Sequence, residues 1–212
     1  MLVFIGLGLS VKHLTREALE YIEMCDVFIV DNYTGLVENV DQLIERIKDK
    51  GKVVILAKRS DLEGSSITRI VEEARTKNIA ILVPGDPFIA TTHDAIRVEA
   101  LKKGVEVRLV HGISIYSLAA SRVGLQAYRF GKMITLVYPD YFKPYSVIET
   151  IYDNLDRNLH TLILLDFRRD EERYMTIPEA VEILMDLDEK GILKKVIGVG
   201  AARLGFSDEY LV

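Results

Sequence analysis

The segment Val83-Pro-Gly-Asp-Pro-Phe-Ile-Ala-Thr-Thr-His93 carries the residue types best suited to bind a small molecule. The apolar run 79–83 predicts a short buried strand, and apolar residues at helical spacing follow over 95–103. A Pro-Gly-Asp-Pro turn therefore stands at the carboxyl end of a strand, where open α/β sheets bind ligands. The Asp86 carboxylate suits hydrogen bonds from the local backbone or from a ligand hydroxyl. His93 either faces that ligand or only begins the helix.

A second candidate ligand loop follows the apolar run at the start of the chain. Gly6-Leu-Gly-Leu-Ser10 comes directly after the apolar residues 2–5, and its two glycines let the backbone approach a ligand closely. A dinucleotide-binding fingerprint needs a third glycine and a following acidic residue, and a phosphate-binding loop needs Lys-Ser or Lys-Thr. None of these is present. The loop is therefore either a binding turn of another kind or a tight connection.

The sequence predicts neither a metal site nor a covalent nucleophile. The histidines show no metal-ligand spacing with cysteine or with one another, which disfavours a structural zinc site. No Ser/His/Asp spacing or nucleophile elbow supports covalent hydrolysis. The four histidines are His13, His93, His111 and His160.

Composition indicates a globular protein and excludes several classes. The 212 residues are 49% hydrophobic and 28% charged, enough for one large or two small domains. A formal net charge of −5 argues against direct nucleic-acid binding. No apolar run reaches the ~18 residues of a membrane span, and no signal peptide is visible. The single cysteine, Cys25, lies in a helical apolar pattern, which predicts a buried thiol and a cytoplasmic protein.

Strand-like runs alternate with helix-like segments through the first half of the chain. This alternation predicts a parallel sheet covered by helices. Basic residues followed by glycine predict helix ends at Gly51 and Gly104. The predicted strands are 2–7, 26–30, 53–56, 79–83 and 105–110.

The pattern changes after Gly112, and a second α/β lobe is predicted. The predicted domains are therefore 1–110 and 111–212. Thr176 is expected to cap the last helix, with Pro178 in its first turn. The elements predicted for the second lobe are helices near 114–121, 146–155 and 178–187, and strands at 132–138, 160–165 and 195–200.

Ordered motifs over nearly the whole chain are similar to those of the diphthine synthase family. That family belongs to the tetrapyrrole methylase-like (class III) methyltransferases, which use S-adenosylmethionine. The Gly-Asp-Pro turn indicates only the wider class, whereas the Ala-Thr-Thr-His, Ser-Ile-Tyr-Ser and Leu-His-Thr-Leu segments point to diphthine synthases. The matching motifs are Phe4–Leu9, Pro84–Pro87 with Ala90–His93, Ser114–Ser117, Gly131-Lys132 with Tyr138-Pro139, Leu159–Leu162 with Leu165-Asp166, and Tyr174–Thr176.

The resemblance implies a fold, a reaction and a set of cofactor contacts. It implies two α/β lobes with S-adenosylmethionine in a cleft between them, and a homodimer. The implied reaction is repeated methylation of the amino group of a modified histidine on translation elongation factor 2, which forms diphthine. Without the family, several of the implied contacts would be interpreted as strand-end core residues, although apolar side chains suit an adenine and a thioether. The implied cofactor contacts are Leu9, Asp86, Ile89, Ser114, Ile115, Leu165 and Leu204.

An amine that attacks a sulfonium methyl needs alignment above all, but it must also lose a proton. Four polar side chains are hypothetical proton acceptors because they follow predicted strands. They are Tyr33, Thr34, His93 and Asp166.

The chain departs from the family pattern near its end. The family normally runs some tens of residues further and has a Pro-Pro-His segment that adds a cofactor contact, whereas residues 204–212 end this chain. Either the chain is truncated, or residues are missing between the Gly205 region and the terminal Glu-Tyr-Leu-Val. The second explanation is favoured, because losing a strand from a lobe would expose a sheet edge and core. Two other functions stay open: methylation of a tetrapyrrole or another small acceptor, and a non-catalytic binding role.

Overall fold

The computed structural model describes the backbone of residues 1–212 and every side chain except that of Asp170. The chain divides into two compact units, Met1–Ile115 and Tyr116–Val212. Unit 1 contains two clusters of buried side chains, one on each face of a sheet, and unit 2 contains a third. The predicted domain boundary after residue 110 falls at the end of the last strand of unit 1.

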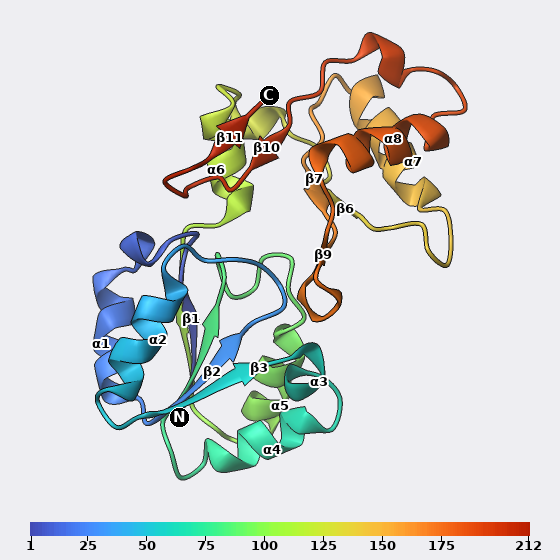
Figure 1. Cartoon of the computed structure of the whole chain (residues 1–212). Coiled ribbons are helices and arrows are strands. Elements are labelled where there is room, and N and C mark those ends of the chain that lie inside the picture. The colour runs from blue at the N-terminus through green and yellow to red at the C-terminus, as the bar shows by residue number, and fades with distance from the viewer. The chain divides into compact units, whose positions relative to one another are not determined.

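Unit 1 is built on a five-stranded sheet in the order β3-β2-β4-β1-β5, and every neighbouring pair is parallel (Figure 1). All residues of β1, β2 and β4 are buried, because helices cover both faces of the sheet. Runs rich in Val, Ile and Leu made these strands predictable, although Glu106 and Arg108 interrupt the run of β5, and all five are confirmed. The strands are β1 (Leu2–Gly6), β2 (Val27–Asp31), β3 (Val53–Ala57), β4 (Ile79–Val83) and β5 (Val107–Val110).

Five helices cover the two faces of this sheet. Helices α1 (Arg16–Met24) and α2 (Val40–Lys48) pack on one face, where Ile22 and Ile44 join the buried cluster. Helices α3 (Arg59–Leu62), α4 (Ser66–Glu73) and α5 (Asp94–Lys102) lie against the other face (Figure 1). A short 3-10 helix, η1 (Val11–His13), connects β1 to α1.

The helix ends of unit 1 have local causes in the sequence. The Thr15 hydroxyl caps α1 by accepting a hydrogen bond from the Ala18 backbone N at 3.0 Å. Gly51 follows α2 with φ +73°, and Gly104 follows α5 with φ +69°. Glycine adopts this left-handed conformation without steric cost, so both predicted helix stops are confirmed.

Unit 2 combines helices with short pairs of strands. Strands β6 and β7 are parallel, whereas the pairs β8–β9 and β10–β11 are antiparallel. The helices are α6 (Ile115–Arg122), η2 (Ala127–Arg129), α7 (Tyr145–Asp156), η3 (Arg169–Glu171), α8 (Ile177–Leu187) and η4 (Leu193–Lys195). The strands are β6 (Ile134–Leu136), β7 (Ile163–Leu165), β8 (Phe167–Arg168), β9 (Arg173–Tyr174), β10 (Ala201–Ala202) and β11 (Tyr210–Leu211).

Helix α8 begins as the sequence predicts. The Thr176 hydroxyl accepts a hydrogen bond from the Glu179 backbone N, and the Glu179 carboxylate accepts one from the Thr176 backbone N at 2.7 Å. This reciprocal capping box satisfies two backbone donors that the first turn would leave unpaired. Pro178 occupies the first turn, where no helical hydrogen bond needs its missing N–H.

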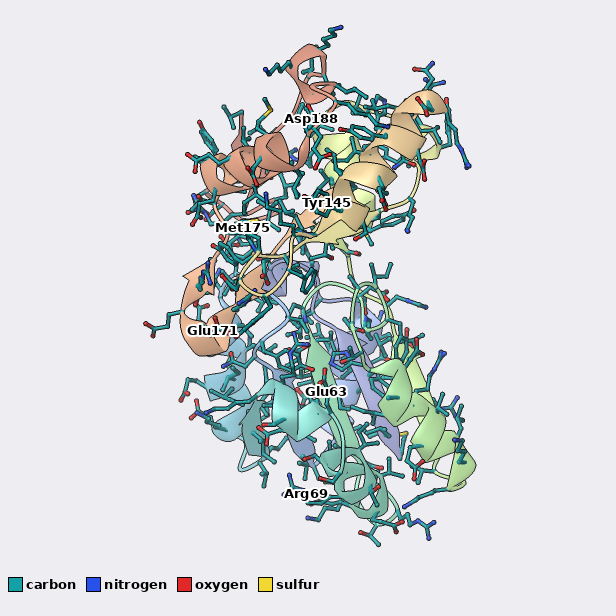
Figure 2. The ribbon with its side chains drawn as sticks, turned by 90° about the vertical axis from the view of Figure 1, so that its right-hand side faces the viewer. Glu63, Arg69, Tyr145, Glu171, Met175 and Asp188 are labelled. Atoms are coloured by element: carbon teal, nitrogen blue, oxygen red, sulfur yellow. The ribbon has the colours of Figure 1, made fainter. Side chains whose placement is uncertain are left out.

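Helices α7 and α8 pack together, and Asp188 ties α7 to the turn after α8. Figure 2 shows Tyr145 in the first turn of α7 and Asp188 just after α8. The Asp188 carboxylate accepts hydrogen bonds from the Tyr152 hydroxyl and from the backbone N atoms of Ile192 and Leu193. Burial raises the pKa of Asp188, but these hydrogen bonds outweigh burial and leave its pKa below the ordinary value.

The predicted strand over 195–200 is wrong. The 3-10 helix η4 occupies Leu193–Lys195, and β10 begins only at Ala201. Ile197 is 91% exposed and Val199 is 53% exposed. The apolar residues of Val-Ile-Gly-Val-Gly predict a buried strand. In the part of the chain that the structure describes, however, no strand pairs with residues 196–199.

Residues 200–212 close into a hairpin. Ala201 pairs with Leu211 and Ala202 with Tyr210, and Gly200 and Val212 exchange two backbone hydrogen bonds of 2.7 and 2.9 Å. Within the loop the Arg203 guanidinium contacts the Asp208 carboxylate at 2.9 Å. The two strands therefore close on each other across the segment where residues were expected to be missing.

Candidate functional site

Three glycines pack backbone against backbone at the carboxyl ends of β4, β1 and β5. A Cβ atom on Gly6 would lie 2.5 Å from the Gly112 backbone N and 2.7 Å from the Gly85 carbonyl oxygen. A Cβ atom on Gly112 would lie 2.2 Å from the same oxygen. Such short distances exclude any side chain at Gly6 and Gly112. Both glycine-containing loops predicted from the sequence therefore meet at one edge of the sheet.

A second contact joins the loop after β1 to the loop after β4. Gly8 and Gly85 exchange two backbone hydrogen bonds of 3.1 and 2.8 Å. Both have positive φ, +68° and +70°, a conformation that side chains rarely adopt. The glycines thus fix the path of the backbone that leads into Asp86.

Asp86 is buried, and it pairs with an exposed histidine. Its Oδ2 lies 2.7 Å from His111 Nδ1 and accepts a hydrogen bond from the Gly112 backbone N at 3.4 Å. Its Oδ1 accepts one from the Phe88 backbone N at 3.3 Å. The Asp86 side chain is 10% exposed, whereas the His111 side chain is 74% exposed. The carboxylate therefore holds one ring nitrogen of His111 and leaves the other, Nε2, toward the surface.

A second carboxylate–histidine pair, Asp31 and His93, is completely buried. Both side chains are 0% exposed, and His93 Nε2 lies 3.3 Å from Asp31 Oδ2. On its other side, His93 Nδ1 lies 3.2 Å from the Pro87 carbonyl oxygen, which can only accept a hydrogen bond. The ring therefore joins the end of β2 to the Gly-Asp-Pro loop.

Two of the predicted proton acceptors, Tyr33 and Thr34, also gather around Asp31. The backbone N atoms of both residues donate to Asp31 Oδ1 at 3.1 Å, and the Thr34 hydroxyl donates to Oδ2 at 2.6 Å. Burial raises the pKa of Asp31, but the adjacent His93 ring and hydrogen bonds from the Thr34 hydroxyl and the Tyr33 backbone N outweigh burial, so the pKa lies below its ordinary value. Burial and the nearby Asp31 charge raise the pKa of Tyr33 to about 12.

The fourth predicted acceptor, Asp166, lies in unit 2 and is already paired. Its Oδ2 accepts hydrogen bonds from the Tyr138 backbone N at 3.0 Å and from Arg168 Nε at 2.9 Å. Arg168 also contacts Asp140 at 2.7 Å, and Asp140 contacts Arg173 at 2.9 Å. The Arg173 guanidinium lies 3.6 Å from the centroid of the Tyr138 ring. Asp166 is thus one member of a charged cluster around Tyr138.

The predicted cofactor contacts fall into two groups, one in each unit. The unit 1 group, Leu9, Asp86, Ile89, Ser114 and Ile115, follows the ends of β1, β4 and β5, three neighbouring strands of the sheet. Leu9, Asp86 and Ser114 are buried, whereas Ile89 and Ile115 are half-buried.

In unit 2, Leu165 ends β7 and is half-buried, and Leu204 is 4% exposed in the β10–β11 loop.

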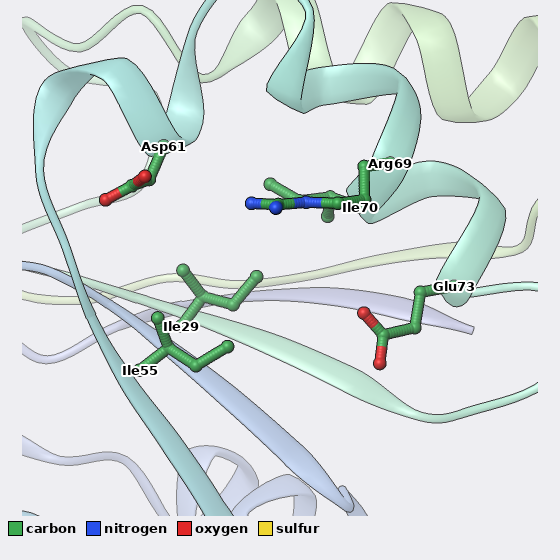
Figure 3. Close-up of a pocket in the computed structure, with 6 residues that line it drawn as sticks. All are labelled: Ile29, Ile55, Asp61, Arg69, Ile70 and Glu73. Atoms are coloured by element: carbon green, nitrogen blue, oxygen red, sulfur yellow. The ribbon is translucent and has the colours of Figure 1, made fainter.

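A separate cavity of about 300 Å³ lies on the α3–α4 face of the unit 1 sheet (Figure 3). Ile29 of β2, Ile55 of β3 and Ile70 of α4 contribute apolar side chains to it, and Asp61, Arg69 and Glu73 contribute charges. Residues 29 and 55 belong to the middle of their strands, not to the carboxyl edge. None of the predicted site residues lines this cavity.

Metal, membrane and thiol chemistry find no support in the described residues. Among the side chains that the structure describes, no group of three or more His, Cys, Asp or Glu is placed to hold a metal ion. No helix in the described chain is long and apolar enough to cross a membrane. Cys25 is buried as predicted, and burial raises the pKa of its thiol to about 11, so the reactive thiolate is disfavoured at neutral pH.

Comparison with known proteins identifies the family to which this chain belongs. The family model for tetrapyrrole (corrin/porphyrin) methylases matches residues 1–212, so the chain belongs to that family of methyltransferases. It is 63% identical to the diphthine synthase of Staphylothermus marinus over all of the chain and 80% of that protein. It is 40% identical to the diphthine synthase of Archaeoglobus fulgidus over 99% of the chain and 79% of that protein.

A solved structure agrees with the sequence relatives. The crystal structure of a diphthine synthase superposes with a TM-score of 0.87 at 38% identity, covering 99% of this chain and 80% of that one. Within the methylase family, the chain is therefore one of the diphthine synthases, the methyltransferases of diphthamide biosynthesis. The predicted family and α/β fold are confirmed.

The comparison corrects the expectation that residues are missing near Gly205. The match with the Staphylothermus protein spans 214 aligned residues for the 212 of this chain, so it contains no long internal gap. The remaining fifth of that protein lies outside the matched stretch. The closed β10–β11 hairpin gives the structural reason, because its two strands pair directly through a short loop.

Sequence reasoning missed two site residues, Asp31 and His111. A charged residue that ends a buried apolar strand was an available signal for Asp31, because burial demands partners for its carboxylate. His111 directly follows β5 at the same edge as the Gly-Asp-Pro loop, but its pairing with Asp86 requires the strand order.

Proposed function

We propose that this protein transfers methyl groups from S-adenosylmethionine to the amino group of a modified histidine on translation elongation factor 2, forming diphthine. The observation that carries the proposal is the 63% identity to a diphthine synthase over the full chain. The proposal includes a cytoplasmic homodimer and repeated methyl transfer to the same nitrogen.

The residues at the carboxyl edge of the unit 1 sheet fit such a cofactor. Leu9 and Ile89 offer apolar surface for a purine or a thioether, and the Asp86 carboxylate suits the ammonium of the methionine part. The glycines at the strand ends bring three backbone segments to one edge with no side chain between them. When bound, S-adenosylmethionine supplies an electrophilic methyl group on a sulfonium.

Unit 2 contributes the second part of the proposed cofactor set. Leu165 stands at the end of β7, and the buried Leu204 lies in a hairpin loop that is anchored to α6 by the Arg122–Glu209 ion pair. These residues are proposed to hold apolar parts of the cofactor, while the polar acceptor docks at exposed surface. The chain's main contribution to rate is then the alignment of donor and acceptor.

The test is methyl transfer from labelled S-adenosylmethionine. The purified protein is offered elongation factor 2 that carries the unmethylated histidine intermediate, together with a tetrapyrrole precursor. Label in the factor alone supports the proposal. Label in the tetrapyrrole assigns the protein to a small-acceptor reaction instead, and label in neither, without cofactor binding, favours a binding role.

The cofactor set has its own test in a matched pair of variants. Ile89→Ser removes a half-buried apolar side chain and is expected to weaken S-adenosylmethionine binding by about tenfold, since such a side chain contributes roughly 1.5 kcal/mol. Val181→Ser makes the same kind of change at a 52% exposed position on α8 and is expected to leave binding unchanged. Equal affinities for both variants in calorimetry would remove Ile89 from the set.

A further inference from the structure

The Asp86–His111 pair combines a buried carboxylate with an exposed imidazole. Asp86 Oδ2 lies 2.7 Å from His111 Nδ1, and the His111 side chain is 74% exposed. An ionised carboxylate only accepts hydrogen bonds, so His111 Nδ1 must carry the hydrogen. In the neutral ring, Nε2 then keeps its lone pair and points away from the only carboxylate within ion-pair distance among the described side chains.

We propose that His111, oriented by Asp86, is the base that takes the proton from the acceptor amine. The inference rests on the proposed function and adds to it the identity of the proton acceptor. Imidazole changes charge nearest to neutral pH, and a carboxylate on its other nitrogen fixes the ring and stabilises the imidazolium that forms. The same arrangement orients the base in hydrolytic triads.

The position of His111 agrees with this role. It directly follows β5, and Asp86 follows β4, so both stand at the carboxyl edge of the sheet on either side of β1. Gly6, at the end of β1, has no side chain, which lets Gly112 approach the Gly85 backbone. The Gly112 backbone N also donates a hydrogen bond to Asp86 Oδ2. Both His111 and the residue that follows it therefore hold the Asp86 carboxylate in place.

The four acceptors predicted from the sequence are less suited to the task. His93 is 0% exposed with both ring nitrogens directed at Pro87 and Asp31, and the Thr34 hydroxyl donates to Asp31. Tyr33 is 4% exposed, and its raised pKa keeps it protonated. Asp166 is paired with Arg168. His111 is the histidine at this edge that combines a paired nitrogen with an exposed one.

Among the described residues, the charged group paired with the His111 ring is Asp86. Asp86, from the loop after β4, is the titratable group in contact with it, while β1 offers the Gly6 backbone and the chain after β5 offers Gly112.

The proton balance of the proposed step is simple. The acceptor ammonium gives one proton to Nε2 and becomes a neutral amine, and the imidazolium returns that proton to water. A methylated amine that still carries a proton must repeat this step before it can receive another methyl group.

The first experiment measures single-turnover methylation of elongation factor 2 by His111→Asn from pH 6 to pH 9. The asparagine amide can still donate to Asp86 but has no basic nitrogen. At pH 7 we expect the rate constant to fall about 100-fold, a usual contribution of general-base catalysis. The difference from wild type should shrink as pH rises, because water then deprotonates the amine. S-adenosylmethionine affinity should stay within about threefold.

The matched control is His160→Asn, which removes an exposed histidine of unit 2 that packs against Phe130. Its rate constant should equal that of wild type. Full activity of His111→Asn would overturn the proposal. So would a loss confined to S-adenosylmethionine affinity, because His111 would then be a binding residue.

The second experiment does not depend on activity. Nitrogen-15 NMR of the histidine rings, with His111→Asn used to assign the signal, reports which ring nitrogen carries hydrogen. We expect the neutral His111 ring to be the Nδ1–H tautomer, because Nδ1 faces the Asp86 carboxylate. An Nε2–H tautomer would overturn the proposal even if the enzyme is active. Wild-type protein that shows the Nδ1–H tautomer but methylates no elongation factor 2 would refute the proposed function and leave the orientation of the pair standing.

Discussion

The two units bury their strands to different degrees. In unit 1, the central strands β1 and β4 run between two helical layers, and Phe4 and Ile81 are 0% exposed. In unit 2, every residue of β7 is only half-buried, and Tyr141 and Ile197 are more than 90% exposed. A strand covered on both faces has little freedom to shift, so the unit 1 sheet is suited to hold Asp86 and His111 at hydrogen-bond distance.

Unit 2 contains a cluster of charged side chains around Tyr138. Arg168 and Arg173 share Asp140, and Arg173 also lies over the Tyr138 ring. Ion pairs at a partly exposed surface contribute little to folding stability and weaken with salt. We therefore expect unit 1 to be the more stable of the two units and unit 2 to respond more to solution conditions.

Ile→Ala substitutions in the core of each unit test this comparison, and they should have the largest effect on the free energy of unfolding. Ile81→Ala should lower the free energy of unfolding by about 4 kcal/mol, because it leaves a cavity between two covered faces. Ile163→Ala removes the same atoms from a half-buried strand of unit 2 and should cost less than half as much. Chemical denaturation of both variants, with hydrogen exchange to assign each loss to a unit, makes the measurement. Equal losses would contradict the comparison.

Neutralising Asp31 is the next largest expected effect. Asp31→Asn breaks a fully buried pair with His93 and should lower the free energy of unfolding by about 3 kcal/mol at neutral pH. The folded pKa of Asp31 lies below the ordinary value, so its stabilisation is present above the unfolded pKa of about 3.9 and is lost as pH falls through the folded pKa.

The pH dependence supplies the check on Asp31. Wild type and Asp31→Asn should differ most near pH 7, and the difference should narrow below about pH 4, where the wild-type carboxyl also becomes neutral. Thermal unfolding of both proteins between pH 3 and pH 7 measures this. A difference that stays constant with pH would mean that the Asp31 charge adds nothing to the stability of unit 1.

Weakening the charged cluster of unit 2 is the smallest expected effect. Arg173→Gln removes an ion pair with Asp140 and the cation over Tyr138. Because Arg173 is substantially exposed, the loss should be near the limit of detection and should disappear at high salt. Hydrogen exchange of β9 at low and high salt tests this expectation. A large, salt-independent loss would show that the cluster stabilises unit 2 more than burial does.

Much of unit 1 was predictable because its strands are local signals. Its five strands each form within about two residues of the predicted bounds, although Glu106 and Arg108 interrupt the apolar run of β5. In unit 2, the predicted cap Thr176 marks a real helix start. The strand predicted over 195–200 failed for the opposite reason. Its apolar residues have the composition of a buried strand, but burial depends on a neighbouring strand that the sequence does not specify.

The pairings within the candidate site were less predictable. Asp86 and His111 lie 25 positions apart in sequence, and they meet only because β1 separates β4 from β5 and ends in a glycine. Asp31 and His93 meet because β2 neighbours β4. Both pairs depend on the strand order β3-β2-β4-β1-β5, which residue patterns along one chain do not determine.

The glycine contacts at the strand ends have a practical consequence for directed evolution. At Gly6 and Gly112 only main-chain atoms set the spacing, so a library randomised at these two codons should return glycine alone among folded, active clones. Libraries that change the buried side chains on either face of the sheet have more freedom, because the strand ends meet through backbone atoms. An engineer who wants a new methyl acceptor should therefore vary the exposed loops and leave the three glycines untouched.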